Sequence, residues 1–145
     1  TGQDLASVLT VRLVRVQANL NRQAARILGR YGLTLLQWRI LYLLKLEGPM
    51  AATQMHEIMD TDKGQLSRRL KVMEQEGFIK PVEGCAPSRR RDLELTDLGH
   101  QKFDAAIPDM TNRYEHILGR FNEAEQVQLM DFIQRLDEAS EVDPT

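Results

Sequence analysis

The sequence contains few cysteine, proline, glycine or aromatic residues: one cysteine, five prolines, nine glycines and 6% aromatics among 145 residues. The lone cysteine, Cys85, cannot form an intramolecular disulfide, and it excludes zinc and iron–sulfur sites built from several cysteines. Few prolines and glycines, together with 42% hydrophobic and 28% charged residues, exclude fibrous and disordered chains. The length fits one globular domain and argues against two independent ones.

Long hydrophobic runs are also absent. No apolar stretch approaches the roughly 20 residues that a bilayer crossing needs, because charged or strongly polar residues interrupt every run. The N-terminal residues 1–4 show no basic region followed by a long apolar region, so we expect no signal peptide. These absences predict a soluble, cytoplasmic protein that makes no contact with a membrane.

The chain lacks a strong net charge, since 19 basic and 21 acidic residues leave a formal charge of −2. This value hides an asymmetry along the chain. Residues 1–47 hold seven basic and two acidic side chains, residues 61–92 hold eight and five, and residues 122–145 hold one and seven. The basic N-terminal part is a weak indication of a polyanionic partner, and solvated helix faces explain it equally well.

Helical periodicity dominates both ends of the chain. Apolar residues from Leu9 to Tyr31 recur at steps of three and four, which predicts a long helix. Asp4 or Ser7 is suited to cap its start, and Gly29 or Gly32 to end it.

A second stripe, from Val127 to Leu136, follows Asn122, a residue type suited to cap a helix. The small core between the two ends is too short to cover both stripes. We therefore expect them to pair with a second copy of the chain, as a homodimer.

The middle of the chain predicts a helix-turn-helix followed by a β-hairpin. Residues 33–44 are apolar on most sides, residues 51–59 form a shorter helical segment, and residues 62–76 form a third helix that Gly77 closes. The apolar period then changes to two, which predicts strands within residues 78–82 and 92–95. Such a pair of helices places the second one in the major groove of DNA, and the hairpin forms a wing beside it.

The third helix has the side chains that a groove-reading helix needs. Leu66, Leu70 and Met73 hold one side to the core, which leaves a polar face outside. Arginine pairs with guanine and glutamine with adenine, while serine and lysine suit phosphates. The predicted DNA-binding residues on this helix are Lys63, Gln65, Ser67, Arg68 and Lys71. The alternative is a polar face that only water covers.

The loop between the two strands carries the other predicted DNA contacts, which are Ser88, Arg89, Arg90 and Arg91. The three consecutive arginines have no obvious carboxylate partner beyond Asp92, and so dense a positive charge is costly without an anion. Contact with phosphates alone and insertion into the minor groove both remain open.

In the order and spacing of its motifs the chain resembles the multiple-antibiotic-resistance regulators (MarR family). The residues that carry this resemblance are Leu35-xx-Trp38-xx-Leu41-xx-Leu44, Ser67-Arg68, Met73-Glu74-xx-Gly77-Phe78-Ile79, Arg89 and Leu93-x-Leu95-Thr96-xx-Gly99. The resemblance implies a mainly α fold with a small β-hairpin, in which residues 1–145 form one winged-helix domain. Residues 33–98 would be its DNA-binding lobe, and residues 1–32 and 99–145 a helical dimerisation lobe.

The wing departs from the family pattern. The family commonly has Asp-x-Arg there, in which the aspartate orients the arginine that enters the minor groove. Pro87 stands at the aspartate position here, and Arg89 at the arginine position. Either the rigid Pro87 positions Arg89 or Arg90 takes its place, so the inserted arginine remains open.

The first helix and the DNA-binding part, the helix-turn-helix with its hairpin, should meet where aromatic and apolar residues adjoin a cation. Such a junction favours a cleft. The predicted ligand-binding residues are Leu28, Tyr31, Leu36, Trp38 and Arg39. The resemblance implies the same location and a small aromatic acid or phenol as ligand. Trp38 is either core or a ligand wall, and Arg39 pairs with a ligand carboxylate or with a side chain of the protein.

We therefore interpret the chain as a homodimeric transcriptional repressor that binds a pseudo-palindromic operator in double-stranded DNA and is released by a small molecule. The alternative is a winged-helix module for protein–protein contact without specific DNA binding. No enzymatic motif, cofactor or metal site is expected, and the histidines His56, His100 and His116 are scattered. Redox sensors of the family keep their cysteine in the first helix, so we expect no sensor role for Cys85.

Overall fold

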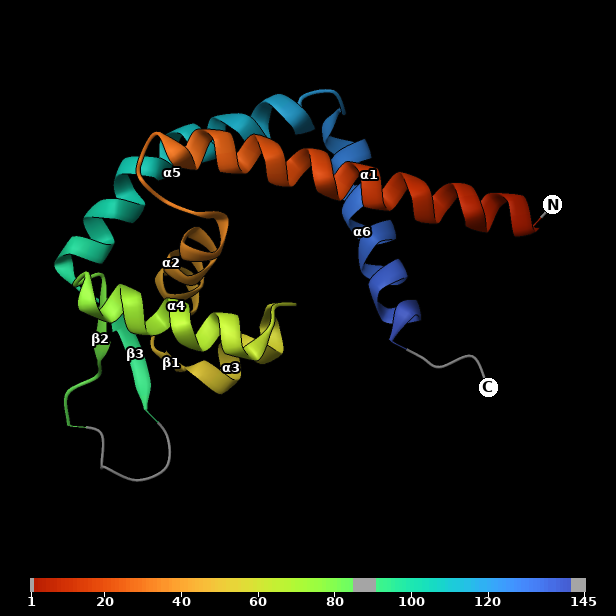
Figure 1. Ribbon diagram of the computed structural model, residues 1–145. Coiled ribbons are helices and arrows are strands. Elements are labelled where there is room, and N and C mark those ends of the chain that lie inside the picture. Colours follow the sequence, from red (N-terminus) through yellow and green to blue (C-terminus); the bar gives the residue numbers. More distant parts are fainter. Residues whose placement is uncertain (1, 85–90, 142–145) are drawn as a thin grey trace. The chain divides into compact units, whose positions relative to one another are not determined.

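The computed structural model describes residues 2–84 and 91–141, which are mainly helical with a small antiparallel sheet (Figure 1). The helices are α1 (Gly2–Gly29), α2 (Leu35–Glu47), α3 (Ala52–Ile58), α4 (Lys63–Gln75), α5 (Asp97–Leu118) and α6 (Glu123–Ser140). The strands are β1 (Met50–Ala51), β2 (Ile79–Pro81) and β3 (Asp92–Leu95). The chain forms two compact units, Thr1–Pro108 and Asp109–Thr145. Within the described residues, no helix is both long and apolar enough to cross a membrane.

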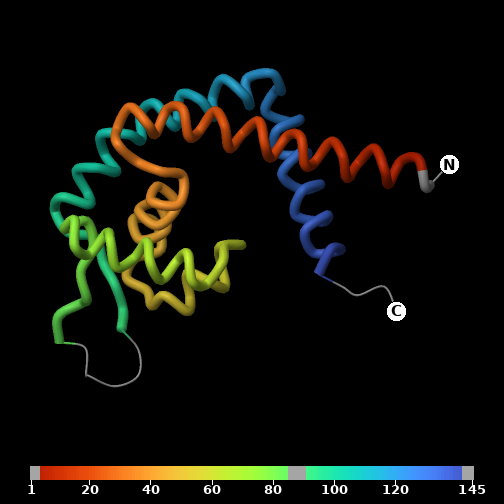
Figure 2. Tube along the Cα trace, in the orientation of Figure 1, coloured from red at the N-terminus to blue at the C-terminus, as the bar shows by residue number. Residues whose placement is uncertain are grey.

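Helix α1 is a single continuous helix of 28 residues (Figure 2). The expected start at Asp4 or Ser7 is wrong, because the helix already begins at Gly2. Asp4 instead lies in the first turn, where its carboxylate interacts favourably with the helix dipole. Ala24 and Leu28 near the other end are buried, and α1 packs on α2 there. The apolar residues of the N-terminal half remain exposed within this unit.

Helix α2 forms the centre of the winged-helix core. Its N-terminus is a capping box, in which Thr34 Oγ1 accepts from the Gln37 N–H at 3.2 Å and Gln37 Oε1 accepts from the Thr34 N–H at 2.8 Å. Ile40 and Leu41 are fully buried. Trp38 stacks on Phe103 of α5, with ring centroids 4.9 Å apart and planes 4° from parallel. The core alternative for Trp38 is therefore the one that the structure shows.

The sheet contains the expected hairpin and one strand more. Strand β3 lies in the middle, and it pairs antiparallel with β2 on one side and with β1 on the other. The predicted hairpin of β2 and β3 is confirmed, and β1 is an additional strand that the sequence pattern did not predict. The register sets Met50 opposite Leu93, and both side chains are buried. Strand β1 thus fixes the base of the wing against α3, which begins at the next residue.

The start of α5 rests on the chain that enters β2. The Thr96 hydroxyl donates to the Gly77 carbonyl and accepts from the Gly99 N–H at 3.0 Å, while the Thr96 N–H donates to the Phe78 carbonyl at 3.1 Å. Gly99 is buried so closely against this segment that a Cβ there would lie 2.1 Å from the Phe78 carbonyl oxygen. Only glycine fits this position without a backbone shift.

We expect Gly99→Ala to lower the free energy of unfolding by at least about 1 kcal/mol, because the new methyl group overpacks a backbone oxygen. Urea unfolding followed by circular dichroism measures this change. Gly29→Ala is the matched control, since a Cβ at Gly29 meets nothing within 4 Å. The control should unfold at the wild-type urea concentration or slightly above it. Equal midpoints for the two variants would contradict the packing argument.

Candidate nucleic-acid interface

Helix α4 is built as a short amphipathic helix, as predicted. Asp62 is its N-cap, and its Oδ2 accepts from the Gln65 N–H at 2.8 Å. Leu66, Leu70 and Met73 are buried and fix the orientation of the helix on the core. Because successive residues are about 100° apart around a helix, the opposite side must face solvent.

The structure brings the predicted residues of α4 together on this solvent side. All five are exposed, namely Lys63, Gln65, Ser67, Arg68 and Lys71. Arg68 lies nearly opposite the buried side of the helix. Its guanidinium reaches back over Gly64, where a Cβ would lie 3.1 Å from Arg68 Nη1 and 3.1 Å from Asp62 Oδ2. Gly64 therefore leaves room for Arg68 at the N-terminal end of α4, a contribution that the sequence pattern did not reveal.

The wing begins directly at the C-terminal end of α4. Gly77 adopts a φ of +83°, a left-handed conformation that favours glycine, and it turns the chain from α4 into β2. Beyond β2, the Val82 N–H donates to the Asp92 carbonyl at 3.0 Å and extends the pairing toward the loop. Three of the predicted wing contacts, Ser88, Arg89 and Arg90, lie outside the described residues.

Arg91 is described, and its surroundings differ from the expectation. Its Nη2 lies 3.0 Å from Oε1 of Glu74, in the last turn of α4. The prediction that the arginines have no carboxylate partner beyond Asp92 is therefore wrong for Arg91. Sequence reasoning missed Glu74 because the two residues are far apart along the chain and meet only through the turn at Gly77.

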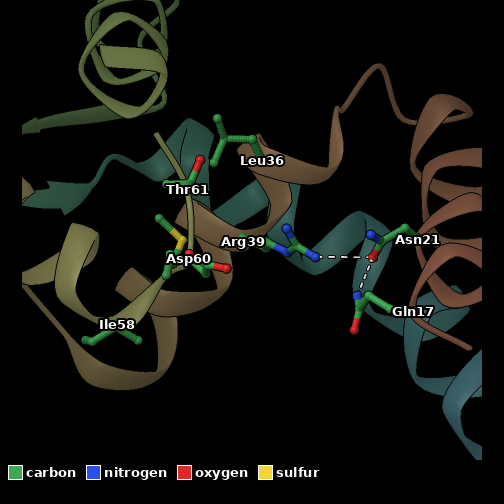
Figure 3. Close-up of a pocket in the computed structure, with 8 residues that line it drawn as sticks. Gln17, Asn21, Leu36, Arg39, Ile58, Asp60 and Thr61 are labelled. Carbon is green, nitrogen blue, oxygen red and sulfur yellow. Dashed lines mark hydrogen bonds between the residues drawn. The ribbon is translucent and has the colours of Figure 1, made fainter. Parts of the chain in front are cut away.

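A cavity of about 580 Å³ lies between α1, α2 and the turn that precedes α4 (Figure 3). Its lining combines amide, hydroxyl and charged groups with three apolar side chains. The lining residues are Gln17, Asn21, Leu36, Arg39, Ile58, Met59, Asp60 and Thr61. A molecule bound there would touch both the long first helix and the turn of the helix-turn-helix.

The polar wall of the cavity is a short chain of hydrogen bonds. Gln17 Nε2 donates to Asn21 Oδ1 at 2.8 Å, and Arg39 Nη2 donates to the same oxygen at 3.3 Å (Figure 3). Within the part of the chain that the structure describes, Arg39 forms no ion pair. A neutral amide thus holds the guanidinium, and the carboxylate of Asp60 lines the same cavity without forming an ion pair with it.

The five predicted ligand residues separate into two groups. Leu36 and Arg39 line the cavity. Leu28 is fully buried and Trp38 is stacked in the core, while Tyr31 is half-buried, and none of these three lines the cavity. In the described segments, no cluster of histidine, cysteine, aspartate or glutamate residues could hold a metal ion.

Comparison with known sequences agrees with this geometry. Residues 33–81, which span α2, α3, α4 and β2, match the model of the MarR family. An HTH-type transcriptional regulator of Bacillus cereus is 24% identical over 141 residues, which cover 94% of this chain and 92% of that protein.

Solved structures share the fold over nearly the whole chain. A MarR/EmrR family transcriptional regulator from Acinetobacter sp. ADP1 has a TM-score of 0.84 at 21% identity, and the match covers 94% of this chain and 96% of that one. The crystal structure of NadR in complex with 4-hydroxyphenylacetate has a TM-score of 0.78 at 23% identity, covering 88% and 91%. The predicted winged helix-turn-helix with long terminal helices is thereby confirmed.

Proposed function

Because the chain belongs to the MarR family of winged-helix transcriptional regulators, we propose that it acts as a homodimeric repressor. The dimer binds a pseudo-palindromic operator, and a small molecule releases the protein from this DNA. Members of this family bind DNA and are not enzymes, which agrees with the lack of an enzymatic motif in the sequence. Residues 33–98 would supply the DNA-binding lobe, and residues 1–32 and 99–145 the dimerisation lobe.

One observation supports this proposal more than any other: the outward side of α4 presents five exposed polar or charged residues beside the exposed Val72, while its inward side is anchored. A groove-reading helix needs a rigid attachment and free donors, and α4 has both. Arg68 would read a base edge, and Lys63, Gln65, Ser67 and Lys71 would share base and phosphate contacts. Ser88, Arg89 and Arg90 would contact the DNA beside it.

The exposed apolar faces of α1 and α6 support a dimer. In α1, apolar residues from Leu5 to Val16 are exposed, and α6 contains no buried residue. The two helices also differ in charge, because α1 carries four arginines and one aspartate whereas α6 carries five acidic residues and one arginine. Pairing with a second copy would cover these apolar faces and set opposite charges near each other.

The cavity beside Arg39 supports release by a small aromatic anion. Its volume suits a drug-sized molecule, and its guanidinium is held by an amide and can pair with a carboxylate or phenolate. The NadR complex shows that a protein of the same fold binds 4-hydroxyphenylacetate. In a dimer, the distance between the two DNA-binding lobes decides whether both can contact the operator. A ligand that binds more tightly when this distance is unsuited to DNA lowers the operator affinity, by an amount set by the difference between its affinities for the two arrangements.

The competing function, a winged helix that contacts only other proteins, makes a different prediction in solution. Fluorescence anisotropy with a labelled random duplex at about 50 and 200 mM salt decides between them, because phosphate contacts make binding strongly salt-dependent. The proposed regulator binds the duplex and loses affinity steeply with salt. A protein-only module shows no binding at either concentration.

We expect 4-hydroxyphenylacetate, used as a probe anion, to weaken DNA binding by about five- to 150-fold, the usual range of allosteric coupling. Arg39→Gln should abolish this effect while the DNA affinity without the probe stays unchanged. Anisotropy titrations with and without the probe measure both. Release by peroxide in the wild type but not in Cys85→Ser, with no effect of any aromatic acid, would contradict the prediction.

A further inference from the structure

Glu74 and Arg91 form an ion pair between the recognition helix and the wing. Oε1 of Glu74 is inaccessible to solvent and accepts no hydrogen bond from the described residues, and the Arg91 Nη2 lies 3.0 Å from it, so the contact is an ion pair. The Glu74 side chain is 22% exposed and that of Arg91 is 64% exposed. A largely buried carboxylate oxygen needs a cation nearby, because burial of an unpaired negative charge is unfavourable.

The position of the pair in the fold is specific. Glu74 lies in the last turn of α4, one turn beyond the exposed polar face. Arg91 directly precedes β3, the strand that returns from the wing loop. The hydrogen bond from Val82 to the Asp92 carbonyl ties the two wing strands to each other at the same level. The ion pair therefore links the returning strand to α4, and the hydrogen bond links it to the outgoing strand.

We propose that Glu74 is a positioning residue for DNA recognition: it holds Arg91 and thereby fixes the direction in which the wing leaves α4. This inference rests on the proposed DNA-binding function. It assigns Arg91 a role within the protein, different from the phosphate or groove contact that its place in the arginine run suggests. The DNA contacts of the wing then fall to Arg89 and Arg90.

The two roles of Arg91 predict effects of opposite sign for a change at Glu74. If Arg91 contacts a phosphate, Glu74 competes with the DNA for the guanidinium, so Glu74→Gln should strengthen binding. If Glu74 holds the wing in place, the same variant should weaken binding although it removes a negative charge near the DNA. Electrostatics alone therefore cannot mimic the effect that the proposal predicts.

The experiment uses the full chain and the duplex that the wild type selects from random DNA. We expect Glu74→Gln and Arg91→Gln each to weaken binding by about three- to thirty-fold, and the double variant to be no weaker than either single one, as for two residues of one interaction. Arg91→Lys should recover part of the affinity. Glu76→Gln is the matched control, since Glu76 is exposed at the end of the same helix and carries the same charge. It should bind as the wild type does, or slightly more tightly.

Hydrogen exchange of the Val82 amide without DNA gives a second readout. Its protection should fall in Glu74→Gln and in Arg91→Gln and remain in Glu76→Gln. Tighter DNA binding by Glu74→Gln, additive losses in the double variant, or unchanged Val82 protection would overturn the proposal. A wild type that binds no duplex at all would instead refute the proposed function, and the exchange measurement would still decide whether the ion pair holds the wing.

Discussion

Leu13→Asp in α1 and Leu136→Asp in α6 are each expected to convert the protein from a dimer into a monomer at micromolar concentration. Leu13 is 46% exposed and Leu136 is 38% exposed in the single chain, so an aspartate at either position is tolerated there. In the proposed dimer the same carboxylate becomes buried without a partner, and two-fold symmetry places it in the interface twice. We expect the dissociation constant of the dimer to rise by more than about a hundredfold.

Sedimentation velocity measures this change directly. Leu46→Asp is the matched control, because Leu46 is an exposed leucine of α2 outside the proposed interface. That variant should sediment as the wild-type dimer does. A wild type that is a stable monomer at micromolar concentration, with all three variants unchanged, would refute the dimer.

Arg68→Ala is expected to lower the affinity for the selected duplex by about 1–3 kcal/mol and to relax the sequence preference at one position of each half-site. Arg68 has this effect because it lies at the middle of the exposed face of α4, with room for its guanidinium above Gly64. Loss of a bidentate contact to a base weakens the correct sequence more than a random one. Titrations with both duplexes measure the difference.

Lys71→Ala is the control for Arg68→Ala. Lys71 lies on the same exposed side and is expected to contact a phosphate, so the variant should weaken all sequences alike. The slope of log affinity against log salt should become shallower by about one unit. Equal losses on selected and random DNA for Arg68→Ala would remove Arg68 from the base-reading role.

The helices of the winged core could be predicted from the sequence because independent local signals agree. For α4, the cap at Asp62, the apolar spacing of Leu66 and Leu70 and the stop at Gly77 all indicate the same helix. The start of α1 was predicted too late, since Asp4 is equally suited to a cap and to the first turn. Strand β1 was missed because two residues cannot show an alternating pattern.

The candidate sites were predictable only where the chemistry of single residues revealed them. Leu36 and Arg39 were identified since an apolar and a cationic side chain share one helix next to the junction. Gln17 and Asn21, which hold Arg39, resemble any solvated amides of a helix face. Trp38 and Phe103 meet only in the folded core, and Glu74 and Arg91 meet only across the turn, so tertiary structure alone reveals these pairs.

Sequencing of the DNA that the purified protein selects from random duplexes tests the central claim most directly. We expect an enriched pseudo-palindrome with half-sites about one helical turn apart, because a two-fold dimer presents two copies of α4 to successive major grooves. A selected pool with no enriched sequence, or with a single asymmetric motif, would contradict the account.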